Sequence, residues 1–141
     1  MTLRNLFFAL AAAMGLLGCA GGGMKLASPC NGGVCQVVVT VTDCIAVGGV
    51  SVSHDPLPVR EMNNIEWVFA AANGYSFPPN GIIIGPDPKR ELDKPNVLPN
   101  GKKVIVKNKH SQTNYKIYYA VNVTKDDGTP CIPLDPWIVN E

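Results

Sequence analysis

Five cysteines and two histidines are the side chains of this 141-residue sequence with the widest range of possible chemistry. A zinc site favours paired C-x2-C motifs with a histidine nearby, whereas here Cys30 and Cys35 are spaced C-x4-C and are followed by Cys44 and a distant Cys131. The two histidines are isolated from each other and from the cysteines. We therefore expect no metal site and no cofactor, with a metal site kept as the competing interpretation.

Motifs for catalysis are absent from the sequence. It contains no G-x-S-x-G, no H-E-x-x-H, and no glycine-rich phosphate loop followed by a helical pattern. Asp126 and Asp127 are adjacent carboxylates, but the Gly128 that follows them is typical of a turn rather than a cation site. His110 could act as a general base, yet no partner is evident beside it. The sequence predicts a protein that is not an enzyme.

The first 18 residues have the layout of a secretory signal. Met1 to Arg4 carries one positive charge, and the 12 apolar residues Leu6 to Leu17 are too few to span a bilayer as a helix. The segment Leu16-Leu17-Gly18-Cys19 resembles a bacterial lipobox, although Leu17 departs from the usual alanine or serine. The resemblance implies cleavage before Cys19 and acylation of that residue. An ordinary secretory signal, with Cys19 as a bystander, is the alternative.

Acylation at Cys19 would make the membrane a partner of the mature chain. Several acyl chains on one residue anchor a protein stably without a transmembrane segment. No aspartate follows Cys19, and the lipoprotein resemblance then implies the outer membrane, facing the periplasm or the cell surface. We expect a signal peptide at 1–18, a flexible tether at 19–34 and a folded domain at 35–141 of a protein of the bacterial cell envelope.

The remaining four cysteines, Cys30, Cys35, Cys44 and Cys131, are an even number in a chain exported to an oxidising compartment. Two disulfides are expected, and three pairings are possible. The Asn31-Gly32 turn signal favours Cys30 with Cys35. An extended strand between Cys35 and Cys44 would keep those two apart, which favours Cys44 with Cys131.

Alternation of apolar and polar residues dominates the rest of the chain and predicts β-strands. The expected strands are 36–42, 49–53, 64–71, 103–108, 115–123 and 137–139. Turn signals separate them, among them Asp55-Pro56 and Asn100-Gly101. This pattern favours an all-β fold, an antiparallel Greek-key β-sandwich, with Trp67, Phe69, Tyr115 and Tyr119 pointing inward.

The order of these elements resembles a cupredoxin. The motifs that carry the resemblance are Val50 to Val59 (V-x-V-x-x-D-P-L-x-V), Asn64 to Trp67, Tyr115 to Tyr119 and Asp135 to Asn140. A blue-copper site would need two histidines, a cysteine and a weak axial ligand, but residues 120–135 supply only Cys131. The resemblance implies a cupredoxin-like sandwich without type 1 copper; an immunoglobulin-like sandwich is the alternative.

A proline-rich stretch, residues 77–101, holds six prolines around the apolar residues Ile82, Ile83 and Ile84. These isoleucines could form an edge strand, which we favour, or an exposed contact patch. If aromatic side chains converge beside them, they would form a surface for an envelope protein or a glycan. The candidate residues for this surface are Tyr75, Phe77, Ile82, Ile83, Ile84 and Trp137.

Charge gives little support to a nucleic-acid partner. Charged residues make up 16% of the chain, with 12 Lys and Arg against 11 Asp and Glu, so no basic patch is available to meet phosphates. We expect an envelope lipoprotein with a non-enzymatic binding or structural domain. The alternative function is metal handling or copper redox chemistry through an atypical set of ligands: His54, His110, Cys131, Asp126 and Asp127.

Overall fold

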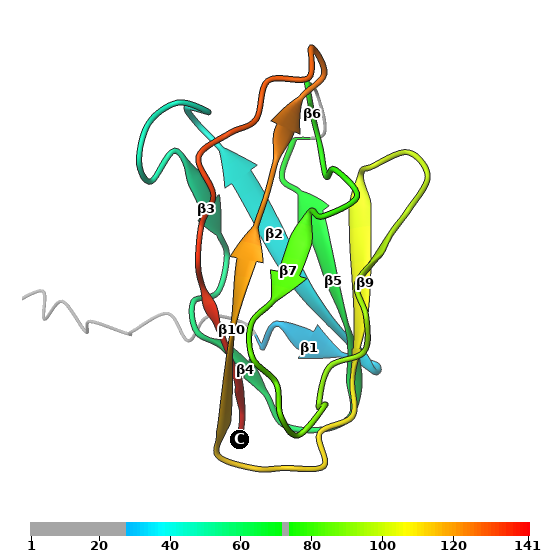
Figure 1. The fold of residues 1–141 in the computed structure, drawn as a ribbon. Coiled ribbons are helices and arrows are strands. Elements are labelled where there is room, and N and C mark those ends of the chain that lie inside the picture. The colour runs from blue at the N-terminus through cyan, green and yellow to red at the C-terminus, as the bar shows by residue number, and fades with distance from the viewer. Residues whose placement is uncertain (1–27, 72–73) are drawn as a thin grey trace, which may run out of the picture.

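Alternating apolar and polar side chains fold this chain into two layers of β-strands packed face to face (Figure 1). The computed structural model describes residues 28–71 and 74–141. The predicted signal peptide, Cys19 and most of the predicted tether lie outside these residues. In the described part of the chain, no helix has the length and apolarity needed to cross a membrane.

Among the described residues, ten strands form the two layers, and two more form a small separate ribbon. The larger sheet has the order β1 (Cys30–Asn31), β2 (Val34–Val41), β5 (Asn63–Phe69), β9 (Lys103–Asn108), β8 (Asn96–Val97), and β3 (Val50–Val52) pairs with β2. The smaller sheet has the order β4 (Leu57–Val59), β12 (Trp137–Asn140), β10 (Tyr115–Val121), β7 (Ile82–Ile84). The ribbon pairs β6 (Tyr75–Ser76) with β11 (Thr124–Lys125).

The β-sandwich is confirmed, but its sheets are mixed rather than purely antiparallel. β2 pairs with β5 in parallel, and β12 pairs with β4 in parallel. The cause is a change of sheet: after β3 the chain crosses from the larger to the smaller sheet and continues as β4 before it returns on β5. β3 runs antiparallel to β2, and the chain keeps that direction through β4 (Figure 1). The next reversal, into β5, therefore makes β5 parallel to β2.

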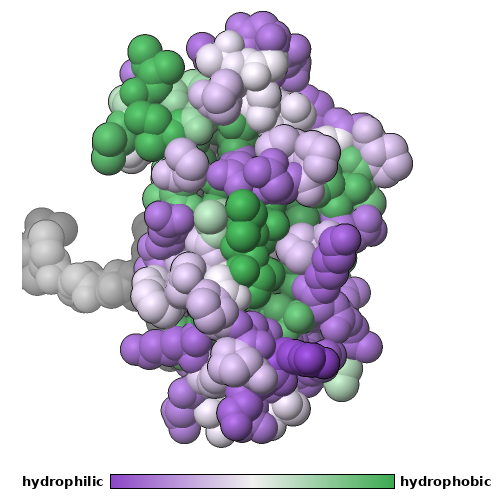
Figure 2. All heavy atoms as spheres, viewed as in Figure 1, coloured by the Kyte–Doolittle hydropathy of each residue, from purple (hydrophilic) through white to green (hydrophobic). Residues whose placement is uncertain are grey.

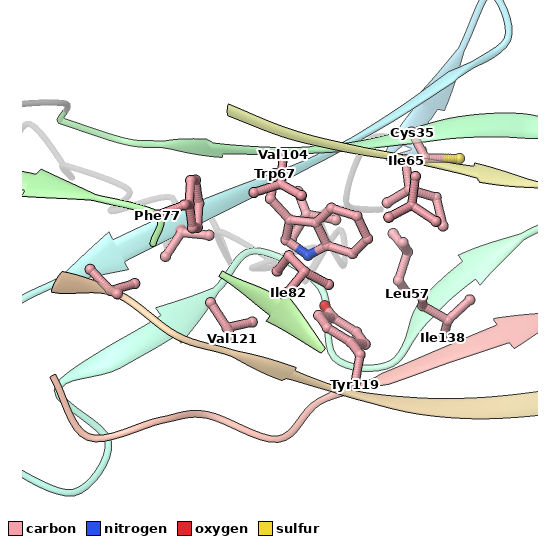
Figure 3. Close-up of a cluster of buried hydrophobic side chains, with 14 of the residues drawn as sticks. Cys35, Leu57, Ile65, Trp67, Phe77, Ile82, Val104, Tyr119, Val121 and Ile138 are labelled. Atoms are coloured by element: carbon pink, nitrogen blue, oxygen red, sulfur yellow. The ribbon is translucent and has the colours of Figure 1, made fainter. Parts of the chain in front are cut away.

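The core lies between the sheets and is built from the inward residue of each alternating pair (Figure 3). Trp67 of β5 and Tyr119 of β10 are fully buried and meet edge to face, with ring centroids 5.3 Å apart. Their polar atoms, Trp67 Nε1 and Tyr119 OH, face each other but have no hydrogen-bond partner of normal geometry. Burial raises the pKa of the Tyr119 phenol, and the nearby Trp67 indole partly opposes that effect.

The domain begins earlier than the sequence predicts. The predicted tether extends to residue 34, yet Cys30 and Asn31 form β1 and pair with Cys35 and Val34 of β2. Gly32 and Gly33 make the two-residue turn between these strands, and both have positive φ angles of 58° and 80°. Glycine adopts such angles without steric cost, so this tight hairpin is favourable. Residues 30–34, which the sequence assigned to the tether, therefore belong to the sheet.

The proline-rich stretch connects the two layers along one side of the sandwich. Its isoleucines form β7, which pairs with β10 at the edge of the smaller sheet, and Asn96 and Val97 form β8 at the edge of the larger sheet. The edge-strand interpretation of Ile82 to Ile84 is therefore confirmed. A single segment supplies an edge to each layer, and this explains why its strands are only three and two residues long.

Candidate functional site

Among the described residues, one disulfide joins two paired strands and another joins two loops, and these are the pairings that the sequence favours. Cys30 is bonded to Cys35 across the β1–β2 hairpin, where the two residues are direct register partners. Cys44, which follows β2, is bonded to Cys131, 87 residues further along the chain. Both cysteines of this second bridge are buried, and while their sulfurs are bonded to each other neither is a thiolate that could bind a metal or act as a nucleophile.

The six-residue surface proposed from the sequence does not form as a unit. Phe77 is 3% exposed and stacks on Phe69, with ring centroids 4.3 Å apart, and Ile82 is also 3% exposed. Both residues were expected at the surface, but the proline-rich stretch folds back over the open side of the sandwich and turns them into the core. Tyr75 is half-buried in the ribbon with β11. The exposed members of the set are Ile83 and Trp137, with Ile84 half-buried.

A different apolar surface lies on the outer face of the smaller sheet. Alternation along β10 and β12 turns Ile117, Tyr119 and Ile138 inward. Tyr118 and Trp137 therefore point outward, 44% and 46% exposed. They are direct register partners, and their rings meet edge to face with centroids 5.7 Å apart. The sequence placed Tyr118 on the outer side of its strand, but its pairing with Trp137 required the register of β10 against β12.

The neighbours of this pair leave it accessible. Gly85, directly after β7, lies beneath the Tyr118 ring, and a Cβ atom added at Gly85 would come within 2.6 Å of it. On the other side of Trp137 there is a hollow of about 280 Å³ lined by Pro56, Lys116, Trp137 and Val139. We define the aromatic face as Tyr118, Trp137 and Ile83, together with this hollow. It offers stacking and apolar contact, with one lysine at its border.

Comparison with known proteins gives no assignment. No protein-family model matches this chain. No curated protein is significantly similar to it in sequence either. The structure establishes a β-sandwich, and the more specific cupredoxin-like fold that the sequence resembles stays a prediction.

The side chains considered for metal binding are dispersed. Within residues 28–71 and 74–141, no three His, Cys, Asp or Glu side chains are placed to hold one ion. His110 follows β9 at one end of the sandwich, whereas Asp126 and Asp127 follow β11 at the other end (Figure 1). His54 lies beside Ser53, with its Nδ1 2.9 Å from the Ser53 hydroxyl. Hydrogen bonds from the backbone and side chain of Thr129 hold the pKa of Asp127 below its usual value, as expected for a carboxylate that caps its own turn.

A buried carboxylate, which the sequence did not indicate, fastens the proline-rich stretch to the rest of the fold. Glu91 has no exposed surface. Its carboxylate accepts hydrogen bonds from the backbone N–H and the hydroxyl of Ser111, the N–H of Gln112 at 3.3 Å and the amide of Asn140 at 3.3 Å. Asn140 also accepts a 2.7 Å hydrogen bond from the amide of Asn108. The buried Glu91 thereby joins the proline-rich stretch to the segment after β9 and to β12.

Proposed function

We propose that this chain is a lipid-anchored, non-enzymatic binding domain of the bacterial cell envelope, and that its aromatic face contacts an envelope protein or glycan. The observation that carries the proposal is the edge-to-face pair of Tyr118 and Trp137, which lies exposed on the outer face of the smaller sheet. Tryptophan and tyrosine are enriched among the residues that dominate the free energy of protein interfaces.

The geometry of the face supports recognition. The two rings hold each other in place, so binding does not have to order either of them. Ile83, with 47% of its surface exposed, extends the face onto β7. The hollow beside Trp137 adds a shallow depression to the face. A flat aromatic surface with a shallow depression suits an extended ligand better than a small molecule, which a deep pocket would enclose.

The position in the cell envelope rests on the start of the chain. The signal pattern ends at Cys19, the lipobox resemblance implies acylation there, and the two disulfides agree with export to an oxidising compartment. Replacing Cys19 with Ala should abolish incorporation of a labelled fatty acid and should make the protein extractable from membranes by carbonate, which removes peripheral proteins but not acyl-anchored ones. Retention of Cys19→Ala protein in carbonate-washed membranes would contradict the anchor.

Binding at the aromatic face can be tested in intact cells. A photo-crosslinking amino acid placed at position 118 or 137 should capture a specific envelope component. The matched control is position 62, because Met62 is 60% exposed but precedes β5 and lies outside the aromatic face. Digestion of the captured material with protease or with glycan hydrolases would distinguish a protein from a glycan. Identical products from all three positions would contradict a binding role for this face.

A further inference from the structure

The loop between β2 and β3 carries the two most exposed aliphatic side chains in the described part of the chain. Ile45 is 73% exposed and Val47 is 91% exposed. Ile132, 38% exposed, joins this loop because its backbone N–H donates a 2.9 Å hydrogen bond to the carbonyl of Cys44. In Figure 2 a group of apolar side chains projects at the upper left, where Figure 1 shows the β2–β3 connection. We call these three residues the apolar apex.

Hydrogen bonds within the β2–β3 loop and a disulfide beside it hold the apex in place. Gly49 donates a 3.0 Å hydrogen bond to Ala46, and the carboxylate of Asp43 accepts one from the N–H of Ile45. Directly below, Cys44 is bonded to Cys131. A Cβ atom at Gly49 would lie 1.7 Å from the carbonyl oxygen of Asp43, so the loop closes tightly on itself. These contacts prevent the exposed isoleucine and valine from folding back onto the sandwich.

The two segments that form the apex carry no charge themselves, although Asp43 directly precedes the first of them and its carboxylate accepts the hydrogen bond from the N–H of Ile45. No charged residue occurs from Cys44 to Ser53, nor from Gly128 to Leu134. Several backbone groups at the apex are also paired within the protein, including the N–H groups of Ile45, Gly49 and Ile132. Low charge and internally paired backbone groups are the two conditions that reduce the cost of transferring a protein segment to the interface of a bilayer.

The size of the apex favours a bilayer over a protein partner. A stable protein interface buries roughly 800 Å² on each side and involves about 20 to 30 residues, whereas three side chains form this projection. A protein would also need a complementary pocket for Ile45 and Val47. A bilayer has no such requirement, because lipid chains rearrange around any apolar projection.

The start of the domain places the apex within reach of an anchored membrane. β1 runs antiparallel to β2, and Pro29 accepts a hydrogen bond from Gln36, so Ser28 lies beside the middle of β2. From there to the end of β2 at Val41 is about 13 Å of strand. The nine residue steps from Cys19 to Ser28 can extend to about 30 Å. An acyl group at Cys19 would thus allow the apex to touch the same bilayer.

We infer that the apolar apex is a membrane-docking element, which inserts Ile45 and Val47 at the surface of a lipid bilayer and orients the domain on it. The inference rests on the proposed lipid anchor only for proximity, since the apex itself supplies the contact. Because no basic residue takes part, docking should be at least as strong on neutral phosphatidylcholine as on anionic lipid and should not weaken with salt. An acyl chain alone would leave the domain free to tumble on its tether.

Fluorescence quenching by brominated phosphatidylcholine tests the contact. The acylated full chain is reconstituted in neutral vesicles as Val47→Trp and, for the control, as Met62→Trp, so that Trp67 and Trp137 contribute equally to both. We expect brominated lipid to quench the added signal of Val47→Trp and not that of Met62→Trp. Equal quenching in the two variants would overturn the inference, even where mass spectrometry confirms the acyl groups.

A second measurement separates the apex from the anchor. The mature chain without signal peptide or acyl groups, made from residue 19 with Cys19→Ala, should float with vesicles, and Ile45→Ser with Val47→Ser should lower its vesicle affinity by at least about tenfold. Absence of acylation in the native protein would refute the proposed anchor and leave this result intact. Flotation that is unchanged by the two serine substitutions, or no flotation at all, would refute docking by the apex.

Discussion

Removing the Cys44–Cys131 disulfide should destabilise the domain about twice as much as removing the Cys30–Cys35 disulfide. The first bridge closes a loop of 87 residues and the second a loop of 5 residues. In the chain-entropy model, these lengths correspond to about 4.6 and about 2.1 kcal/mol of stabilisation at 25 °C. The longer loop matters more because an unbridged chain gains more conformations when it unfolds.

The assay is urea unfolding of the purified chain, with both cysteines of one bridge replaced by alanine in each variant. Cys44→Ala with Cys131→Ala should also raise the dependence of the unfolding free energy on urea, because its unfolded state becomes more expanded. The Cys30→Ala, Cys35→Ala variant is the matched control, since it removes the same atoms and a bridge of the same type. Equal losses of stability, or a larger loss from the short bridge, would refute the reasoning.

Two further predictions concern buried polar groups. Tyr119→Phe should change stability at neutral pH by less than about 1 kcal/mol, because its hydroxyl has no partner of normal geometry. Folding raises the pKa of Tyr119 above its usual 10.0, so above pH 10 the unfolded chain loses this proton more readily than the folded one. The free energy of unfolding should therefore fall as the pH rises above 10. Unfolding at alkaline pH should show a smaller fall for Tyr119→Phe, which has no phenol to ionise. Glu91→Ala should cost roughly 3 kcal/mol, because it removes several hydrogen bonds to a buried carboxylate at once, those from Ser111, Gln112 and Asn140, and Glu91→Gln should cost less. A loss below about 1 kcal/mol for Glu91→Ala in thermal or urea unfolding would contradict this role.

Strands were the most predictable part of the fold because their signal is local. The alternation around Trp67 and Tyr119 is enough to show which side of each strand is buried, and both side chains do lie in the core. Pairing between strands is not local. The parallel contact of β2 with β5 depends on where the chain changes sheets near Asp55 and Pro56, and no residue there encodes which strand comes next.

The candidate site was less predictable, since exposure depends on what covers a segment. Phe77 and Ile82 lie among prolines and looked like loop residues, but the stretch that contains them closes the side of the sandwich. Glu91 is charged and sits in the same stretch, whereas its partners Ser111 and Asn140 are 20 and 49 residues away. The apolar residues of the β2–β3 loop resemble core residues in composition, and only the fold shows that nothing covers them.

The edges of the smaller sheet limit how any ligand can attach to it. At one edge, Pro58 of β4 has no N–H group to donate, and the Sγ atom of Cys30 lies 3.6 Å from its carbonyl oxygen. At the other edge, β7 is only three residues long. A peptide that binds by adding a strand needs a longer row of free backbone donors and acceptors. A ligand of the proposed aromatic face would therefore have to be recognised through side chains, and its specificity could change by substitution without any change in the backbone.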